Sequence, residues 1–329
     1  MHAARLHAFG PAGNLTYEEA PDPVPGPGQV RIAVEAAGVH LIDSVLRAGR
    51  QLGPFPLPEL PTIPGREVAG TVDALGEGTD ASWLGRRVTV HLGQVPGGYA
   101  ELAVADAAAL HPVPDALSAP AAVAMIGTGR TVMGVLRSAR IAPEDTVLVL
   151  AAAGGMGALL AQYAKHRGAF VVGAAGGEAK TALVRELDVD LAVDYARAGW
   201  ADRVRAELGG DRPVTQLFDS PGGVLARTAL DLLAPGGVHH AYGGSSSLVS
   251  DDATPALTDE ELSARGITVQ PLPAALVQGH KRELEEESLA LAAKGVLVPL
   301  VSTYRLAEAA EAHAALESRA TTGKVVLVP

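Results

Sequence analysis

The stretch Thr146-Val-Leu-Val-Leu-Ala-Ala-Ala-Gly-Gly-Met-Gly157 decides the fold of this chain. Its run of β-branched and leucine residues predicts a strand, and the small residues that follow predict a tight turn. Apolar side chains then recur at helical spacing, at Leu159, Leu160, Tyr163 and Ala164. Strand, turn and helix in this order are typical of the first unit of a parallel α/β sheet.

The turn between this strand and helix has the small residues that a dinucleotide site needs. Ala152, Gly154 and Gly157 occupy the three small-residue positions of the dinucleotide fingerprint, with alanine at the first. A Cβ at Gly154 would hold the backbone away from a pyrophosphate, and one at Gly157 would push the helix off the strand. The helix N-terminus offers unpaired N–H groups and a positive dipole end to the phosphates. Because the chain has 38 glycines, the alternative is a glycine-rich turn without a ligand.

The composition leaves room for two ordinary domains. The chain has 329 residues, of which 48% are hydrophobic and 19% charged, so we expect sizeable cores and no global disorder. A net charge of −11 without a Lys/Arg-rich run argues against a nucleic-acid partner. The chain has no cysteine, which excludes disulfides, thiolate zinc sites and cysteine nucleophiles. Residues 1–25 lack a secretory signal pattern, and no apolar run reaches about 18 residues, so we expect a cytoplasmic protein without a membrane span.

The pattern of predicted elements changes near residue 120. Before it, Gln29–Ala36, Glu67–Leu75 and Arg87–His91 suit strands and are separated by Pro- and Gly-rich joints, which suggests a compact barrel-like domain. After it, helices and strands alternate, which predicts a parallel sheet covered by helices on both faces. The predicted strands are Thr146–Leu150, Ala169–Val172, Leu191–Val193, Val214–Phe218 and Val238–Tyr242. The predicted helices are Ala121–Ala139, Ala179–Leu187, residues 200–208 and Leu225–Leu233.

The pattern from Ile267 onward is less regular. Arg282–Ala293 and Leu306–Ser318 are predicted helices, and Lys324–Val328 is a predicted strand that could return to the first domain.

The end of the second predicted strand bears on the choice between NAD and NADP. A site that prefers NAD usually carries Asp or Glu about 20 residues past the first glycine position, bonded to the ribose 2′-OH. Here Val172–Lys180 ends the strand in small residues without a carboxylate at its tip. Lys180 can neutralise a 2′-phosphate, which favours NADP. The alternatives are that Lys180 is a solvated helix-start lysine and that Glu178 binds the ribose.

Several segments, in order along the whole chain, resemble one family. They are Glu35–Asp43 (EAAGVHLID), Pro64–Gly70 (PGREVAG), Gly97–Glu101 (GGYAE), Gly129–Thr131 (GRT), Ala151–Gly157 (AAAGGMG), Asp219-Ser220, Tyr242-Gly243 and Thr322–Leu327 (TGKVVL). Together they resemble the medium-chain dehydrogenase/reductase superfamily, and within it the zinc-free, zeta-crystallin-like NADPH:quinone oxidoreductase branch.

The resemblance implies two domains and a site between them. Residues 1–120 with 265–329 would form a GroES-like catalytic domain, and residues 121–264 a doubly wound Rossmann domain. Hydride transfer from NADPH would take place in the cleft between the domains, and the family suggests a homodimer. By motif position, His40 and Thr131 would lie near the nicotinamide. The residues implied to hold the rest of the cofactor are Gly154, Gly155, Met156, Gly157, Lys180, Tyr195, Ser220, Tyr242, Gly243 and Arg319.

Three departures from the family pattern concern the acceptor and the cofactor. His40 replaces an asparagine, and Val45 and Gln51 stand where quinone reductases often have tyrosines, which puts quinone as the substrate in doubt. Gly176 replaces a serine that commonly helps hold the 2′-phosphate, which weakens NADP specificity without reversing it, since Lys180 remains.

No metal site is expected. Zinc alcohol dehydrogenases of the superfamily have a His-Glu pair where this chain has Arg66-Glu67, and an arginine cannot serve as a zinc ligand. The pair His239-His240 lies in a predicted strand, where adjacent side chains point to opposite faces.

Two functions remain open from the sequence. The first is a zinc-independent NADPH-dependent reductase of quinones, enones or enoyl thioesters. Hydride would go to the β-carbon, and His40, Thr131 or water would donate a hydrogen bond or proton to the carbonyl oxygen. His40 is either the proton source or a structural histidine near the cofactor ribose. Asp43 and Arg47, at i and i+4, are expected to form an ion pair. The second function is an NADPH-binding protein with little or no turnover, acting as a sensor, structural protein or interaction partner.

Overall fold

The computed structural model describes residues 1–52, 56–93, 97–245 and 254–329. The chain forms two compact units. Unit 1 consists of Met1–Gly129, Glu285–Lys294 and Val301–Pro329, and unit 2 consists of Arg130–Leu284 and Gly295–Leu300. Both chain termini belong to unit 1.

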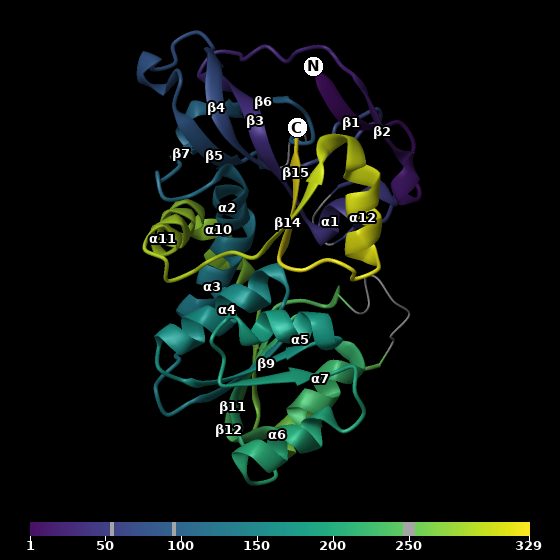
Figure 1. Ribbon diagram of the computed structural model, residues 1–329, viewed down its shortest axis with the longest axis vertical. Coiled ribbons are helices and arrows are strands. Elements are labelled where there is room, and N and C mark those ends of the chain that lie inside the picture. Colours follow the sequence, from purple (N-terminus) through teal and green to yellow (C-terminus); the bar gives the residue numbers. More distant parts are fainter. Residues whose placement is uncertain (53–55, 94–96, 246–253) are drawn as a thin grey trace. The chain divides into compact units, whose positions relative to one another are not determined.

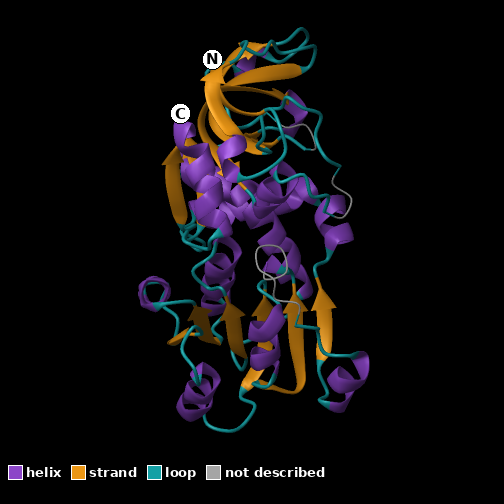
Figure 2. Ribbon diagram, turned by 90° about the vertical axis from the view of Figure 1, so that its right-hand side faces the viewer, coloured by secondary structure: helices purple, strands orange, loops and turns teal. Residues whose placement is uncertain are grey.

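Unit 2 contains a six-stranded sheet in which all neighbouring strands pair in parallel. The strand order is β10-β9-β8-β11-β12-β13, which is the 3-2-1-4-5-6 order of the Rossmann fold. Figure 2 shows these strands with their arrowheads pointing the same way. The strands are β8 (Thr146–Leu150), β9 (Phe170–Ala175), β10 (Leu191–Asp194), β11 (Val214–Asp219), β12 (Leu233–Ala241) and β13 (Thr268–Pro271).

Helices lie before, between and after the strands of unit 2. They are α3 (Arg130–Ser138), α4 (Gly155–His166), α5 (Glu178–Arg185), α6 (Trp200–Leu208), α7 (Gly223–Leu230), α9 (Asp259–Ala264) and α10 (Ala274–Gly279). Val147, Leu148, Val149 and Leu150 are all 0% exposed, as expected for a central parallel strand buried on both faces.

Unit 1 is built on a seven-stranded sheet and a separate antiparallel pair. The sheet has the order β14-β15-β3-β4-β5-β7, and β6 also pairs with β3. Its strands are β3 (Gln29–Val39), β4 (Glu67–Leu75), β5 (Arg87–His91), β6 (Leu102–Asp106), β7 (His111–Pro112), β14 (Val301–Arg305) and β15 (Lys324–Val328). The separate pair is β1 (His2–Leu6) with β2 (Leu15–Glu19).

The C-terminal strand returns to the first domain, as the sequence predicts. β15 pairs antiparallel with β3 and parallel with β14, and Figure 1 shows the two yellow strands β14 and β15 side by side. The remaining α-helices are α1 (Leu41–Arg47), α2 (Ala119–Ala124), α11 (Lys281–Ala293) and α12 (Ala309–Glu317). Short 3-10 turns lie at η1 (Ala12–Asn14), η2 (Ala81–Trp83), η3 (Ala107–Ala109) and η5 (Leu306–Glu308).

The helical segment Ala119–Ser138 includes a π-helical turn, η4 (Met125–Gly129). The predicted helix Ala121–Ala139 is interrupted by this turn. Among the described residues, this is the one helix long and apolar enough to cross a membrane, but 78% of its apolar window is buried inside the protein. A helix so largely buried is weak evidence for a membrane span.

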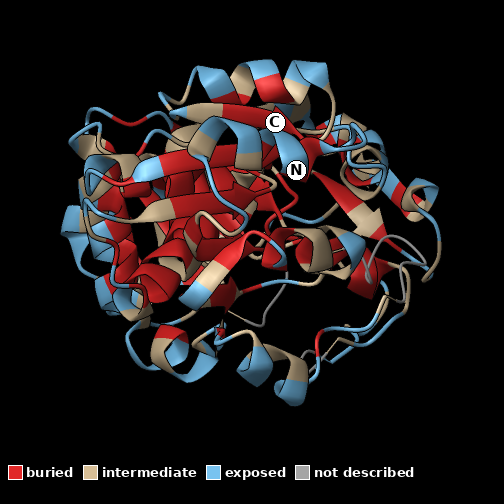
Figure 3. Cartoon of the chain, turned by 90° about the horizontal axis from the view of Figure 1, so that it is seen from below, coloured by how far each residue is buried: buried red, intermediate tan, exposed pale blue. Residues whose placement is uncertain are grey.

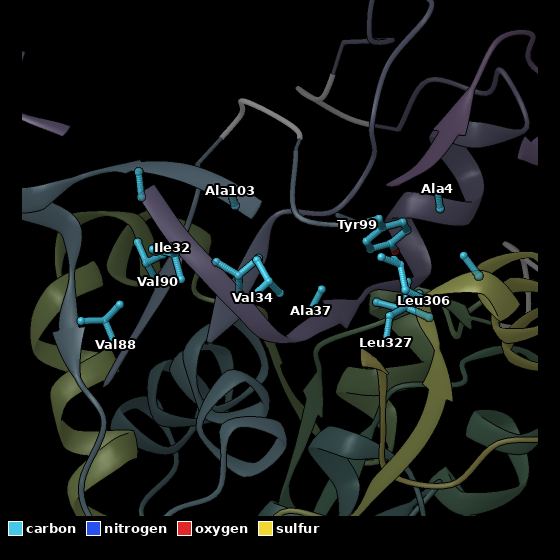
Figure 4. Close-up of a cluster of buried hydrophobic side chains, with 14 of the residues drawn as sticks. Ala4, Ile32, Val34, Ala37, Val88, Val90, Tyr99, Ala103, Leu306 and Leu327 are labelled. Carbon is cyan, nitrogen blue, oxygen red and sulfur yellow. The ribbon is translucent and has the colours of Figure 1, made fainter. Parts of the chain in front are cut away.

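Each unit has its own hydrophobic core. In unit 1, side chains of β3, β5 and β15 pack with Tyr99 and Leu306 (Figure 4). In unit 2, the core includes Leu148, Val172 and Leu217 from the parallel strands. Figure 3 shows the buried segments in red within a layer of exposed ones in pale blue.

Several predicted boundaries are wrong. Unit 1 continues beyond the predicted limit at residue 120 to Gly129. The parallel sheet continues through β13, which pairs with β12, so unit 2 extends beyond the predicted limit at residue 264 to Leu284. The predicted helix Leu225–Leu233 ends at Leu230, and Leu233 already belongs to β12. β13 (Thr-Val-Gln-Pro) is too short and too mixed in polarity to show a strand period, and the apolar residues of Leu225–Leu233 suit a helix and a strand equally.

Candidate functional site

The turn after β8 has the shape that the sequence predicts for a dinucleotide site. Gly154 is the N-cap of α4. A Cβ on Gly157 would lie 2.3 Å from the Ala151 carbonyl oxygen, so the close approach of helix and strand requires glycine there. A Cβ on Gly154 would meet only that same oxygen, at 3.1 Å, and otherwise open space. The turn therefore leaves the backbone accessible at Gly154, which fits a pyrophosphate at the N-terminus of a helix.

The other predicted cofactor residues of unit 2 follow the carboxyl ends of the strands. Tyr195 follows β10, Ser220 follows β11, and Tyr242 and Gly243 follow β12. Ends of neighbouring parallel strands share one edge of the sheet, where ligands bind in open α/β sheets. A Cβ on Gly243 would lie 2.7 Å from the Ser220 carbonyl oxygen, so these two turns are closely packed. Burial raises the pKa of Tyr242, which keeps this phenol protonated.

The carboxylates near the end of β9 are already engaged. Asp194 accepts hydrogen bonds from the backbone N–H groups of Gly177, at 2.7 Å, and Ala196, at 2.9 Å. These bonds lower the pKa of Asp194. Glu178 pairs with Arg185 at 3.0 Å and with Arg197 at 3.2 Å.

Basic side chains accompany these carboxylates at the same strand ends. Lys180 lies in the first turn of α5. Arg197 was missed by sequence reasoning, because its approach to Glu178 depends on β10 lying beside β9. The acidic side chains at this edge already have partners, and basic side chains lie beside them. This environment favours the 2′-phosphate of NADP over the ribose 2′-OH of NAD, which would need an available carboxylate.

A buried cluster of charged side chains lies in unit 1 around Glu67, at the start of β4. Glu67 is 0% exposed. Its Oε1 lies 2.9 Å from His40 Nε2 and 2.5 Å from Lys324 Nζ, and its Oε2 accepts the Gly127 N–H at 2.9 Å. Burial alone would raise the pKa of Glu67, but the charges of His40 and Lys324 outweigh it and hold this pKa far below its usual value.

Glycines make room for this cluster. A Cβ on Gly38 would lie 2.0 Å from Glu67 Oε1. One on Gly127 would lie 2.3 Å from Glu67 Oε2 and 2.8 Å from His40 Cε1. The side chain of His40 is 23% exposed, although its Nε2 contacts the fully buried carboxylate. His40 is thus the most exposed side chain of the cluster, although its Nε2 atom is itself buried against the carboxylate.

Asp43 connects this cluster to a second buried network. Its Oδ2 accepts the His40 N–H at 2.8 Å and the Tyr99 hydroxyl at 3.1 Å. The Tyr99 oxygen also lies 3.1 Å from His313 Nε2. Burial raises the pKa of Tyr99 and lowers the pKa of His313 to about 4, so Tyr99 stays protonated and His313 neutral.

The predicted ion pair between Asp43 and Arg47 is wrong. Asp43 Oδ1 lies 3.5 Å from Arg66 Nε. Arg47 instead donates to the Gly10 carbonyl at 2.7 Å and pairs with Glu317. Both side chains of α1 are buried, and a buried charge must be paired or hydrogen-bonded. Here the partners come from other elements of the fold and not from the same helix.

The structure distributes the predicted site residues over both units. Thr131 lies in α3 of unit 2, whereas His40 and Arg319 belong to unit 1. Arg319 follows α12 with a left-handed φ of 57°. Of the two substituted pocket positions, Val45 is buried and Gln51 exposed.

Sequence reasoning missed the roles of Glu67, Lys324 and Tyr99. Each stands inside a motif quoted for the family resemblance, in PGREVAG, TGKVVL and GGYAE respectively. A charged or phenolic side chain within such a motif was the available signal.

The histidines of β12 point to opposite sides, as predicted. His239 Nε2 lies 3.0 Å from Asp219, whereas His240 lies 2.9 Å from Gln216 and stacks on Phe218. Within residues 1–52, 56–93, 97–245 and 254–329, no group of three or more His, Asp or Glu is placed to hold a metal ion.

The comparisons with known proteins agree with this two-part architecture. Residues 26–115 match the alcohol dehydrogenase GroES-like domain, and residues 187–327 match the zinc-binding dehydrogenase model. The chain is 34% identical to the 2-haloacrylate reductase of a Burkholderia species, over 99% of this chain and 98% of that protein. It is 31% identical to the quinone oxidoreductase of Pseudomonas aeruginosa, over 98% of both.

Solved structures show the same fold. The Escherichia coli quinone oxidoreductase complexed with NADPH has a TM-score of 0.84 and 28% identity, with both chains covered in full. An NAD-dependent alcohol dehydrogenase has a TM-score of 0.85 and 28% identity, again over both full chains.

A Rossmann sheet and a GroES-like unit in one chain define a dehydrogenase or reductase of two domains. The chain belongs to the medium-chain dehydrogenase/reductase superfamily, in its quinone oxidoreductase branch. It is an oxidoreductase with a small-molecule acceptor. The alternative of a binding protein without turnover gains no support from these relatives, which are named as enzymes.

Proposed function

We propose that the protein is a zinc-independent reductase that uses NADPH to reduce a quinone or an α,β-unsaturated carbonyl compound. The observation that carries the proposal is the environment of His40. Its ring is partly exposed and yet in contact with Glu67, which also contacts the Lys324 ammonium. A partly exposed imidazole held by a buried carboxylate is a suitable proton donor to an acceptor that has gained negative charge.

NADPH is the cofactor. The open backbone at Gly154, the N-terminus of the 12-residue helix α4 and the strand-end turns fit its pyrophosphate and nucleosides. The residues that would hold it are Gly154, Gly155, Met156, Gly157, Lys180, Tyr195, Ser220, Tyr242, Gly243 and Arg319. When bound, NADPH supplies a hydride with its electron pair to the acceptor.

The chain's own residues would supply the proton that completes the reduction of the acceptor. An acceptor that gains hydride at its β-carbon carries negative charge on the carbonyl oxygen and needs one proton to complete the reduction. His40 would hold that proton on its imidazole, with Glu67 stabilising the charged ring. The Thr131 hydroxyl is the second candidate donor to the carbonyl oxygen.

Zinc independence is proposed from the charges around Glu67. The residue before it is Arg66, whose guanidinium cannot ligate zinc, and its Oε1 already contacts the Lys324 ammonium. A fixed lysine cation supplies positive charge at this carboxylate without a metal. We therefore expect activity to survive prolonged dialysis against a chelator, measured as NADPH oxidation before and after.

The test of the proposed function is NADPH oxidation by the purified protein against quinones, enones, unsaturated acids and enoyl thioesters. Replacement of His40 by Gln should lower kcat about 100-fold on the best acceptor and leave the Kd for NADPH within about 3-fold. His7→Gln is the matched control, because His7 also contacts a glutamate through Nε2, at 2.9 Å, but on the surface. Cofactor binding without turnover on any acceptor would reject the reductase.

Two finer parts of the proposal have their own tests. Lys180→Gln should raise the KM for NADPH about 10-fold and leave that for NADH nearly unchanged, because NADH lacks the 2′-phosphate. Equal effects on both cofactors would rule out this role of Lys180. The homodimer rests on the family resemblance, and light scattering of the purified protein tests it.

A further inference from the structure

A chain of hydrogen bonds runs through the interior of unit 1 from α12 to the residue that precedes α1. It starts at His313, passes through the Tyr99 hydroxyl and the Asp43 carboxylate, and ends at the backbone N–H of His40. The three donor–acceptor distances are 3.1, 3.1 and 2.8 Å in this order. His313 and Tyr99 are 0% exposed and Asp43 is 5% exposed, so none of them can replace a lost partner by bulk water.

The available hydrogens fix the direction of this chain. A phenol has one hydrogen, and Tyr99 donates it to Asp43 Oδ2. The Tyr99 oxygen therefore accepts from His313, whose proton lies on Nε2. His313 Nδ1 is buried and has no hydrogen-bond partner within the described part of the chain, so a proton on that nitrogen would lack an acceptor.

The chain ends on a residue that is held at two places. His40 is the N-cap of α1, where its N–H is bound by Asp43 Oδ2 and its carbonyl oxygen accepts the Asp43 N–H at 2.9 Å. At the other end of the side chain, Nε2 of the ring lies 2.9 Å from Glu67. Glu67 thus anchors the ring, and Asp43 anchors the backbone from which the ring projects.

The position of Asp43 depends in turn on α12. Its Oδ1 lies 3.5 Å from Arg66 Nε, beyond the usual length of a hydrogen bond, whereas its Oδ2 has the closer contact with Tyr99. One turn further along both helices, Glu317 of α12 pairs with Arg47 of α1. Two successive turns of α12 therefore hold two successive turns of α1.

We propose that Tyr99 and His313 are positioning residues for His40 in the reduction of the acceptor. They hold Asp43, and Asp43 holds the His40 backbone so that the imidazole keeps its place against Glu67. The inference rests on the proposed role of His40 as proton donor and extends that role to two buried residues distant in the sequence. Proton transfer requires a fixed donor, and a misplacement of about 1 Å can cost about 100-fold in rate.

Variants that remove single hydrogen bonds test the inference. Tyr99→Phe should lower kcat about 10-fold and change the KM for NADPH and for the acceptor less than about 3-fold. His313→Gln keeps an N–H for Tyr99 and should retain kcat within about 3-fold, whereas His313→Leu should lower it as much as Tyr99→Phe does. Equal kcat in the two His313 variants would overturn the inference, and this pair decides the question if Tyr99→Phe does not fold.

The matched control removes a buried hydrogen bond elsewhere in unit 1. Thr89 of β5 is 0% exposed and donates to the Val68 carbonyl at 3.1 Å. Thr89→Val should lower the urea concentration at the midpoint of unfolding and leave kcat as in wild type. A fall in kcat equal to that of Tyr99→Phe would show that any loss of interior hydrogen bonding slows the enzyme, and would overturn the inference.

A double variant shows whether Tyr99 acts through His40. In the His40→Gln background, Tyr99→Phe should lower kcat by less than about 2-fold, because the group that it positions is already absent. A further loss of about 10-fold would show that the two residues act independently, and would overturn the inference. Wild-type kcat in His40→Gln alone would instead reject the proton-donor role in the proposed function.

NMR tests the hydrogen-bond chain without turnover. The His40 amide proton should exchange with solvent at least about 10-fold faster in Tyr99→Phe than in wild type or Thr89→Val. The ¹⁵N shifts of the His313 ring should show the proton on Nε2. Unchanged exchange at His40, or a proton on Nδ1 of His313, would overturn the inference whatever the activity of the protein.

Discussion

Glu67 is the residue around which the polar interior of unit 1 is arranged. It is fully buried, and the cost of burying its charge is offset by the Lys324 ammonium, the His40 ring and the Gly127 N–H. Lys324 is also nearly inaccessible, at 5% side-chain exposure, so neither ion has water as an alternative partner. The Glu67–Lys324 pair therefore determines the electrostatic environment of the His40 ring.

Replacement of Lys324 by Met should destabilise the protein. Breaking a buried ion pair by removing one partner typically costs about 3–5 kcal/mol. Glu67 would then be left in the interior with the His40 ring and the Gly127 N–H as its remaining partners. Urea unfolding of wild type and variant measures the loss of stability.

Lys165→Met is the control for that change. Lys165 forms a 2.7 Å pair with Asp190 in which the side chains are 25% and 28% exposed, so its loss should cost about 0–1 kcal/mol. Equal losses of stability in Lys324→Met and Lys165→Met would show that the buried ammonium does not stabilise the Glu67 carboxylate.

The sequence locates His40 but not its partners, for a physical reason. β15 pairs antiparallel with β3 so that Val325 lies opposite Val39, and this register brings Lys324 next to His40. Such a pairing joins the two ends of the chain and leaves no local signal. The motifs contained the charged residues, but only the strand register shows which of them meet.

At the scale of elements, the turn between β8 and α4 contains two glycines with different structural roles. Gly157 permits the helix to approach the strand, and Gly154 leaves open backbone. Both tasks are predictable from the sequence, because a βα unit is local and its turn chemistry is specific. The short elements β13 and α10 were not predicted, since a few residues of mixed polarity give no clear period.

The same substitution at these two glycines should have opposite consequences. Gly157→Ala should destabilise the protein by about 1–3 kcal/mol, because its Cβ would meet the Ala151 oxygen at 2.3 Å. Gly154→Ala should leave the free energy of unfolding within about 1 kcal/mol. It should weaken NADPH binding at least 10-fold, because the added Cβ would occupy the space proposed for the pyrophosphate. Urea unfolding and fluorescence titration with NADPH measure the two effects. Tight NADPH binding by Gly154→Ala would contradict the placement of the pyrophosphate.

At the scale of the whole molecule, each unit contains one buried histidine that folding keeps neutral. Burial lowers the pKa of His313 in unit 1 to about 4. In unit 2, burial and then the charge of His239 lower the pKa of His240 to about 4. The ordinary histidine pKa is 6.5, so between these values the unfolded chain binds two protons that the folded chain does not. Both units are consequently expected to lose stability in mild acid.

The sign and size of that loss follow from linkage. Above pH 6.5 neither the folded nor the unfolded chain binds these two protons, so the free energy of unfolding is not reduced by them. It falls as the pH decreases below 6.5 and levels off below about pH 4. Between these limits each histidine contributes a slope of up to about 1.4 kcal/mol per pH unit. His313→Gln and His240→Gln keep a side-chain N–H for Tyr99 and for Gln216 and should each remove one histidine's share of the slope, measured by urea unfolding at pH 7.5, 6.0 and 5.0. His166→Gln, at an exposed position, should leave the slope as in wild type. An unchanged slope in both buried variants would show that the acid sensitivity arises from other groups.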